Sequence, residues 1–353
     1  MGIEMKSRRR FVGKSLLALG AAGLVSPVQS FNIVSRATSK GEIVGHGDFK
    51  YRVNKEWGVQ DPSSVPVKDC HEMVQDRKGR LILLTNHTNN NVIFYDKSGK
   101  VKSTWGGKFP GAHGLTLSQE GEEDFLFITD HDRHMVFKTT LDGKILMELE
   151  YPKETGVYEE PGKYKPTEVA VAPNGDFYVA DGYGQNYIIQ YSASGEYIRH
   201  FGGTGDGEEQ FQCCHGVTLD TRDVKNPTLL ISSRTKQEFK RFTLEGKHLE
   251  TIQIPGAWVC RPVIKGENLY FAVIVTKTWD SFDGMIAVLD KNNKVVSFPG
   301  GMAPDYENGK LKPASSDRAT FFNPHDVCID DDENIYVPQW ASKNTYPVKL
   351  ERI

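Results

Sequence analysis

Short apolar runs of strand length recur along most of this chain, and turn-forming residues separate them. The runs are rich in β-branched and aromatic residues, as in RLILLTN at 80–86. Each follows another short apolar segment and a polar turn, such as DRKGR at 76–80. Runs bounded by Gly, Asp and Asn in this way are typical of antiparallel β-strands. Six equivalent runs lie at 80–86, 124–130, 176–181, 228–234, 268–275 and 334–339.

The six runs belong to one repeating unit of four strands. After each of the first five comes a third strand-like segment, then a turn with Gly and a fourth segment, as in SGKVKSTWGG at 98–107 and SGEYIRHFGG at 194–203. Helical periodicity is missing beyond the N-terminal segment. Four antiparallel strands in each of six units predict an all-β fold, a six-bladed β-propeller.

The last unit predicts how the ring closes. It stops after a third strand, YPVKLERI at 346–353, whereas DFKYRVNKEWG at 48–58 looks like a fourth strand that precedes the first unit. An N-terminal strand that completes the last blade would remove an exposed sheet edge. We therefore expect the propeller to span 48–353, preceded by a weakly patterned linker at 31–47.

Residues 1–30 have the pattern of an export signal. SRRRFVGK at 7–14 leads into the apolar run at 16–25, and small residues follow at 28–30. Paired arginines followed by Phe11 and Lys14 predict a twin-arginine signal. The alternative is a membrane anchor, but the run has about half of the ~20 residues that a spanning helix needs. We expect a periplasmic or extracellular protein that meets the twin-arginine export machinery and keeps no stable membrane anchor.

Composition narrows the possible partners. The chain has 353 residues, 25% of them charged, with a net charge of −3. It carries no basic stripe, so nucleic acid is not expected as a partner. Five cysteines show no disulfide-scaffold spacing. Cys70, Cys214 and Cys260 each precede a core strand, which favours buried thiols, and the oxidation state of Cys213 and Cys214 stays open.

Aligning the first strands gives one position per blade that faces the propeller axis. Three histidines occupy alternate blades and would converge on the axis with threefold geometry. Three imidazoles with an open fourth position are what a catalytic zinc requires, because water or substrate takes that position. A lone histidine here would more often be structural. The six aligned residues are His71, His113, Thr167, His215, Arg261 and His325.

His71 complicates the zinc set of His113, His215 and His325. It lies on the same ring, between blades 6 and 2. It could be a fourth ligand, could orient a ligand through a hydrogen bond, or could contact the substrate. A fourth protein ligand would close the site and argue against catalysis.

The ends of the second strands form the mouth of the predicted channel. In VADGYGQN at 179–186 the turn could place Tyr183 over the axis, where a nearby dication would let its phenol lose a proton and act as a base. Ordinary aromatic packing is the alternative. Arg234 could bind a carboxylate through its planar fork, or form a structural ion pair. Asn86 and His87 occupy the same layer in the first blade.

These segments resemble the peptidyl-α-hydroxyglycine α-amidating lyases, within the wider group of NHL-type propellers. HGLTLSQEGEEDFLFITDHDRHMVFK at 113–138 resembles the second blade of that family, and the segment at 165–202, which contains DGY, resembles the third more closely. HGVTLD at 215–220 with SSRTKQEFKRF at 232–242 resembles the fourth, and NPHDVCID at 323–330 the sixth.

The resemblance implies a role for each matched residue. His113, His215 and His325 would bind zinc, Tyr183 would take the proton of the substrate hydroxyl, and Arg234 would help to hold the substrate. Asp326 would help to hold a structural calcium in the channel. The family releases glyoxylate and an amide from a peptide-derived α-hydroxyglycine.

Three departures from the family pattern concern the substrate grip. Asn86 and His87 stand where the family has a further arginine, Asn323 replaces a methionine, and Gly184 replaces a disulfide cysteine. Arg261 on the axial ring could replace the missing arginine. The same metal chemistry on a different substrate, or a binding site inherited from it, is therefore expected.

Three functions remain open from the sequence. The first is a zinc-dependent lyase acting on a small hydroxylated substrate, and the second is a metal-assisted hydrolase such as a lactonase, which would not need Tyr183. The third is a non-catalytic propeller that binds a partner on its rim. The fold alone does not separate them, because propellers host many functions.

Overall fold

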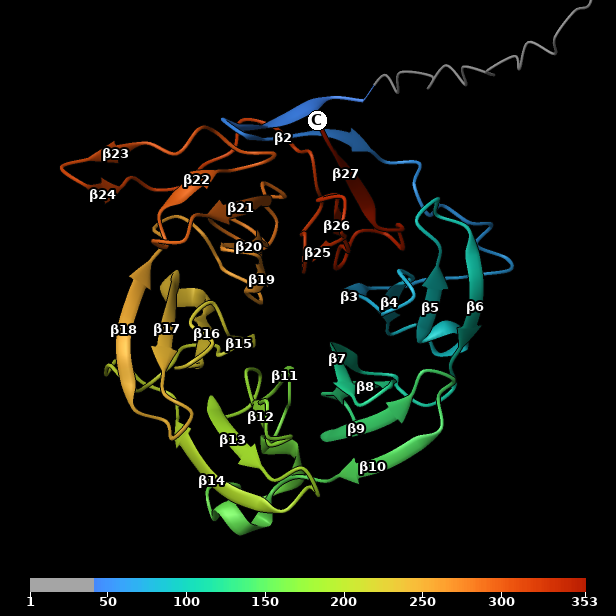
Figure 1. Cartoon of the computed structure of the whole chain (residues 1–353), viewed down its shortest axis with the longest axis vertical. Helices are drawn as coiled ribbons and strands as arrows, with labels where there is room; N and C mark the ends of the chain where they lie inside the picture. Colours follow the sequence, from blue (N-terminus) through green and yellow to red (C-terminus); the bar gives the residue numbers. More distant parts are fainter. Residues whose placement is uncertain (1–40) are drawn as a thin grey trace, which may run out of the picture. The chain divides into compact units, whose positions relative to one another are not determined.

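The apolar runs form the second strands of six antiparallel sheets arranged around a common axis. A computed structural model describes residues 41–353. The strands β3, β7, β11, β15, β19 and β25 lie nearest the centre of the ring (Figure 1). The six-bladed β-propeller is therefore confirmed.

Each of the first five blades has four strands in sequence order. Blade 1 contains β3 (Cys70–Gln75), β4 (Leu81–Thr85), β5 (Val92–Tyr95) and β6 (Val101–Trp105). Blade 2 contains β7 (Ala112–Glu120), β8 (Glu123–Asp130), β9 (Met135–Thr140) and β10 (Ile145–Leu149). Blade 3 contains β11 (Glu168–Val171), β12 (Phe177–Ala180), β13 (Tyr187–Tyr191) and β14 (Tyr197–Gly202). Blade 4 contains β15 (Val217–Asp220), β16 (Thr228–Ser233), β17 (Glu238–Phe242) and β18 (His248–Gln253). Blade 5 contains β19 (Val263–Lys265), β20 (Asn268–Val273), β21 (Met285–Leu289) and β22 (Val295–Ser297).

The last blade combines strands from the beginning and the end of the described residues, 41–353. Its order is β1 (Ile43–His46), β2 (Phe49–Asn54), β27 (Val348–Arg352), β26 (Ile335–Val337) and β25 (Cys328–Ile329). Strand β2 pairs antiparallel with β27, with Tyr51 opposite Arg352. The predicted closure of the ring by an N-terminal strand is confirmed.

The core lies between neighbouring blades. Strands β4 and β5 are buried on both faces, since each blade packs against the next, whereas the outer strand β10 alternates between half-buried and exposed residues. The Trp57 ring, just after β2, packs 4.6 Å from the Tyr336 ring and 5.2 Å from the Tyr95 ring. These contacts join the closing blade to blade 1.

Three details differ from, or add to, the sequence analysis. Strand β1 falls within the expected linker at 31–47, so the propeller begins before residue 48. This segment has little hydrophobic pattern of its own, and it forms a strand because β1 pairs with β2. A small hairpin of β23 (Tyr306–Glu307) and β24 (Lys310–Leu311) is inserted between blades 5 and 6. The expected export signal at 1–30 lies outside the described residues.

Helical structure is confined to single turns. The helices of residues 41–353 are four 3-10 turns, η1 (Thr88–Asn90), η2 (Lys153–Thr155), η3 (Pro161–Lys163) and η4 (Arg234–Lys236). Within this part of the chain, no helix has the length and apolar character needed to cross a bilayer.

Candidate metal centre on the propeller axis

Four histidines meet at the beginnings of the inner strands. His71 and His113 lie in β3 and β7, and His215 and His325 lie just before β15 and β25. Gly216 follows His215, and a Cβ there would lie 2.5 Å from the Cα of Arg261. Only glycine permits this close approach of the neighbouring inner segments that carry His215 and Arg261.

The four imidazoles form one compact group. Ring centroids of His113 lie 4.7 Å from His215 and 4.8 Å from both His71 and His325. His215 and His325 are also 4.8 Å apart, centroid to centroid. One ring nitrogen from each of His71, His113 and His325 lies within 4.8 Å of the others. The structure therefore brings together all four axial histidines.

Backbone hydrogen bonds fix the orientation of two imidazoles. His113 Nδ1 lies 2.9 Å from the Thr167 carbonyl, and His325 Nδ1 lies 3.0 Å from the His71 carbonyl. Each Nδ1–H donates a hydrogen bond to its carbonyl, which leaves the Nε2 lone pair available. Metal-binding histidines are commonly held in this way.

Several buried ring nitrogens in the group lack a hydrogen-bond partner among the described residues. They are Nε2 of His325, Nδ1 of His215 and both nitrogens of His71. Nε2 of His113 and Nε2 of His215 lie 3.1 Å apart. Two nitrogens bound to one tetrahedral zinc at about 2.0–2.1 Å would be about 3.3 Å apart. The donor set therefore fits a bound metal.

Burial keeps these histidines neutral. It lowers the pKa of His113, His215 and His325 well below the ordinary histidine value, and mutual repulsion adds to this effect. Burial also lowers the pKa of His71 to about 3. Neutral imidazoles keep the lone pairs that a metal needs.

Tyr183 lies beside the histidines. Its hydroxyl is 3.1 Å from Nε2 of His113 and 3.1 Å from Nε2 of His215. The residue is 39% exposed. Because the hydroxyl contacts both imidazoles, we assign this exposure to the rest of the side chain. Burial of the hydroxyl raises the pKa of Tyr183, and the positive charge of Arg234 opposes this.

The turn that carries Tyr183 is held by Asp181. The Asp181 carboxylate accepts hydrogen bonds from the Gln185 amide at 2.6 Å and the Tyr158 hydroxyl at 2.8 Å. A Cβ on Gly184 would lie 2.0 Å from Asp181 Oδ1. The glycine that departs from the family pattern is therefore required by this turn, which leaves no room for the side chain of a cysteine.

Arg234 is a buried cation next to Tyr183. Its Nη1 lies 3.4 Å from the Tyr183 hydroxyl, its Nε donates to the Val259 carbonyl at 3.3 Å, and its Nη2 lies 3.3 Å from the Cys260 sulfur. Among the described residues it forms no ion pair with a carboxylate. A buried guanidinium without an anionic partner is suited to binding an anion.

Asn86 and His87 have structural partners. The Asn86 amide oxygen accepts from the Asp69 backbone N–H at 3.0 Å, and its Nδ2 donates to the Asp69 carboxylate at 3.0 Å. His87 caps η1, with Nδ1 accepting from the Asn89 amide at 3.3 Å. These bonds tie the loop after β4 to the first strand of the blade.

The expectations for Arg261 and Asp326 need correction. The Asp326 carboxylate forms an ion pair with Arg261 at 2.6 Å instead of facing an open cation site, and further oxygens surround the guanidinium. A calcium ion beside Asp326 does not fit this arrangement. Nor can Arg261 replace the missing substrate arginine, because each of its three nitrogens is engaged by protein oxygens.

His131 joins the site without having been singled out as a functional residue. Its ring lies 5.8 Å from the rings of both His113 and Tyr183, and it contacts Asp132 at 3.0 Å. Its position at the end of β8, in the layer of Asn86 and Tyr183, is the signal in the sequence that could have identified it.

Curated relatives agree with the resemblance to the amidating lyases. Peptidyl-alpha-hydroxyglycine alpha-amidating lyase 1 of Drosophila melanogaster is 42% identical over 113 residues, which are 30% of this chain and 19% of that protein. Peptidyl-glycine alpha-amidating monooxygenase of Mus musculus is 30% identical over 269 residues, which are 70% of this chain and 24% of that protein. The chain thus matches about a fifth to a quarter of the length of these relatives.

Other comparisons concern the fold. NHL repeat-containing protein 3 of Homo sapiens is 27% identical over 137 residues, 37% of this chain and 40% of that protein. A gluconolactonase from Xanthomonas campestris has a similar structure, with a TM-score of 0.60, 11% identity and coverage of 89% of this chain and 95% of that one. A streptogramin B lyase gives a TM-score of 0.54 at 14% identity, covering 82% and 95%. No family model matches the chain.

Proposed function

We propose that this propeller is a zinc-dependent lyase acting on a small hydroxylated substrate, such as a hemiaminal or an α-hydroxy amide. One observation carries the proposal. Four buried, neutral imidazoles converge on the axis, and three of them carry unpartnered nitrogens. Two of the four contact the hydroxyl of Tyr183, and a buried guanidinium without a carboxylate partner lies beside that hydroxyl. Similarity to proteins named as amidating lyases supports the same class of reaction.

In this proposal His113, His215 and His325 hold the metal. A zinc bound there would polarise the substrate hydroxyl and lower its pKa. Tyr183 would act as a phenolate, which Arg234 and a zinc bound beside it would stabilise against the effect of burial. It accepts the hydroxyl proton as the C–O bond becomes a carbonyl and the C–N bond breaks. The same phenol then returns the proton to the departing nitrogen. An α-hydroxyglycine would give glyoxylate and an amide, with atoms and charge in balance.

Arg234 has the complementary role of binding the substrate's anionic group. Its Nη1 lies 3.4 Å from the Tyr183 hydroxyl, so a carboxylate bound by the guanidinium would lie next to the base. Asn86 and His87 stand where the lyase pattern has another arginine, and both are already engaged, Asn86 by Asp69 and His87 by its own loop. We therefore expect one strong anion contact and a substrate preference that differs from that of the relatives.

Metal content and glyoxylate release test the proposal together. The purified wild-type chain should hold about one zinc, and a His113→Ala/His325→Ala variant should hold almost none. Glyoxylate release from an N-acyl-α-hydroxyglycine should disappear in the same variant. His248→Ala is the matched control, because His248 bonds to Thr251 on the outer strand β18. Wild-type protein without zinc after refolding in zinc would contradict the proposal and favour a rim-binding propeller.

A metal-assisted hydrolase is the second candidate. It is favoured by the loss of the expected arginine at Asn86 and His87, while the likeness to a gluconolactonase concerns the fold alone. Hydrolysis of a lactone would not need a phenol as base. Turnover of a lactone, with little loss of rate in Tyr183→Phe, would favour this function over the lyase.

We also propose that residues 1–30 direct export by the twin-arginine route to the periplasm or the extracellular space. The motif SRRRFVGK and the short apolar run support it. Replacing Arg8, Arg9 and Arg10 with lysine should retain the uncleaved precursor inside the cell, which fractionation and mass spectrometry would detect. Normal export of that variant would contradict the proposal.

A further inference from the structure

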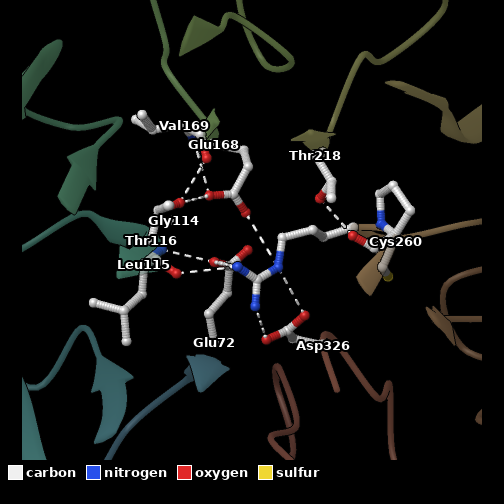
Figure 2. Close-up of polar contacts among 12 residues, drawn as sticks. Glu72, Gly114, Leu115, Thr116, Glu168, Val169, Thr218, Cys260 and Asp326 are labelled. Atoms are coloured by element: carbon white, nitrogen blue, oxygen red, sulfur yellow. Dashed lines mark hydrogen bonds and ion pairs between the residues drawn. The ribbon is translucent and has the colours of Figure 1, made fainter. Parts of the chain in front are cut away.

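A second polar cluster lies on the axis below the histidines. The Arg261 guanidinium is surrounded by three buried carboxylates, and Figure 2 shows them converging from separate strands. Asp326 binds Nε and Nη2 at 3.1 and 2.6 Å. Glu72 and Glu168 each lie 3.5 Å from a guanidinium nitrogen.

Two main-chain carbonyls complete this oxygen cage. Nη1 of Arg261 donates to the Leu115 carbonyl at 3.1 Å, and Nη2 donates to the Met73 carbonyl at 3.3 Å. The contacting residues come from β3, β7 and β11 and from the segment before β25, while Arg261 itself precedes β19. A single side chain thereby connects the inner strands of five blades.

The carboxylates are fixed by hydrogen bonds of their own. Glu72 Oε2 accepts from the Leu115 amide at 2.7 Å, and Asp326 Oδ2 accepts from the Met73 amide at 3.1 Å. Glu168 Oε1 accepts from the Thr116 hydroxyl at 2.9 Å. The oxygen positions are thus set by the strands and do not depend on Arg261 alone.

The set of oxygens is the kind that calcium prefers. Carboxylate and backbone carbonyl oxygens are the usual protein ligands of Ca²⁺. Three carboxylates also exceed the single positive charge of the guanidinium. Burial raises the pKa of Glu72 well above its ordinary value, with repulsion from Glu168 and Asp326 adding to this against the opposing charge of Arg261.

We propose that Arg261 is a built-in cation that takes the place of a structural metal ion in the channel. The guanidinium already uses the Asp326, Leu115 and Met73 oxygens that a calcium ion would need. Its delocalised charge and planar donors can bond several oxygens at once, as a metal ion does. The channel is therefore held together without calcium, and removing the guanidinium uncovers a calcium site.

An ion could reach the uncovered site from the far mouth of the channel. A cavity of about 750 Å³ is lined by the distal parts of the inner strands, among them Gln75, Gln119 and Ile329, and Arg261 forms part of its wall. The histidines lie at the opposite ends of these strands. Calcium entry on this side therefore does not involve the proposed zinc site.

Calcium binding by full-length wild-type and Arg261→Ala proteins tests the inference, in buffer with one equivalent of zinc. The proteins are dialysed to equilibrium against about 1 mM Ca²⁺, a concentration that also fills weak protein sites. The wild type should then retain no bound calcium. Arg261→Ala should bind about one ion, and its Tm should rise by about 3 °C or more. Asp326→Asn in the Arg261→Ala background should abolish that binding.

Two outcomes would overturn the inference. One is a stoichiometric calcium ion in the wild type, and the other is a folded Arg261→Ala protein that ignores calcium. If Arg261→Ala folds only in calcium-containing buffer, the inference is supported. Arg261→Lys keeps the positive charge, so this variant should fold and remain free of calcium; a bound calcium in it would contradict the built-in cation.

Discussion

Nε2 of His113 and Nε2 of His215 lie 3.1 Å apart, although 102 residues separate them along the chain. Two neutral imidazoles gain little from facing nitrogen to nitrogen unless a proton or a cation lies between them. The Tyr183 hydroxyl, 3.1 Å from both, completes a triangle of polar atoms at the mouth of the channel. This triangle is where we expect the chemistry to occur.

The ligand set can be resolved by comparing two single variants. His215→Gln should lower zinc affinity by about 100-fold or more, because a ligand is lost, whereas His71→Gln should change it by less than about 10-fold. The His71 carbonyl that orients His325 is kept in the second variant. Competition with a fluorescent zinc chelator gives both affinities. The reverse order would assign the site to His71, His113 and His325, whose nitrogens also cluster.

Tyr183→Phe should separate base chemistry from metal binding. Loss of the phenol should lower kcat for glyoxylate release by about 10²–10⁴-fold, the usual contribution of a general base. Bound zinc should stay at the wild-type level, since Tyr183 is not in the proposed ligand set. Single-turnover kinetics and elemental analysis on the same sample make the comparison. A variant that keeps full lyase activity would remove Tyr183 from the mechanism.

The metal-free protein should lose stability as pH falls below about 6.5. Burial depresses the pKa of all four axial histidines in the folded state, so the unfolded chain takes up protons that the folded chain does not. As the pH falls, each histidine lowers the free energy of unfolding by up to about 1.4 kcal/mol per pH unit, so four together approach a loss of about 5.6 kcal/mol per unit. Urea unfolding between pH 7.5 and 5 measures this slope.

A variant provides the control for the pH dependence. Replacing His71 with Asn should reduce by about one the number of protons taken up on unfolding, because the histidine with a folded pKa of about 3 is removed. The free energy of unfolding should therefore depend less steeply on pH. In zinc-loaded protein the free energy of unfolding should fall more steeply with decreasing pH, over the range in which the metal dissociates. Equal slopes for wild type and His71→Asn in the metal-free state would mean that His71 does not titrate on unfolding.

The closing seam should control the stability of the whole ring. Val53 in β2 is 5% exposed and lies opposite Leu350 of β27. Val53→Asp would bury a charge between the two chain segments and should cost about 3 kcal/mol or more. Lys55→Asp, an exposed change two residues later, should cost less than about 0.5 kcal/mol. Chemical denaturation reports both, and equal effects would show that the seam is not critical.

Repeats made most of the fold predictable from the sequence. The six core runs are found in β4, β8, β12, β16, β20 and β26, with end shifts of up to two residues. Strand β1 and the β23–β24 hairpin could not be inferred in the same way. They are short, lack a counterpart in the other units, and gain order from pairing with a neighbouring strand.

The alignment of the repeats placed the four histidines together, as the structure does. For Arg261 the same alignment suggested a substrate contact, whereas the side chain forms an internal ion pair. An aligned position gives the height of the backbone along the propeller axis. It does not give the position of the charged end of a long side chain, which can reach another layer. Arg261 reaches Asp326 and two carbonyls, since Glu72, Glu168 and Asp326 attract it electrostatically. Each of those acidic residues directly follows an axial residue in its blade. The cluster becomes evident only when the three blades are placed around the axis.

The pairing of β2 with β27 also bears on how the chain reaches its native state. The paired residues Tyr51 and Arg352 are about 300 positions apart, so this contact has a high sequence separation. During synthesis the segment that ends at Asn54 emerges long before Val348–Arg352, so it must wait for its partner strand. Until then β27's place beside β2 is empty and the strand edge is open to other chains. The slowest folding step should therefore be ring closure, which is also when aggregation is most probable.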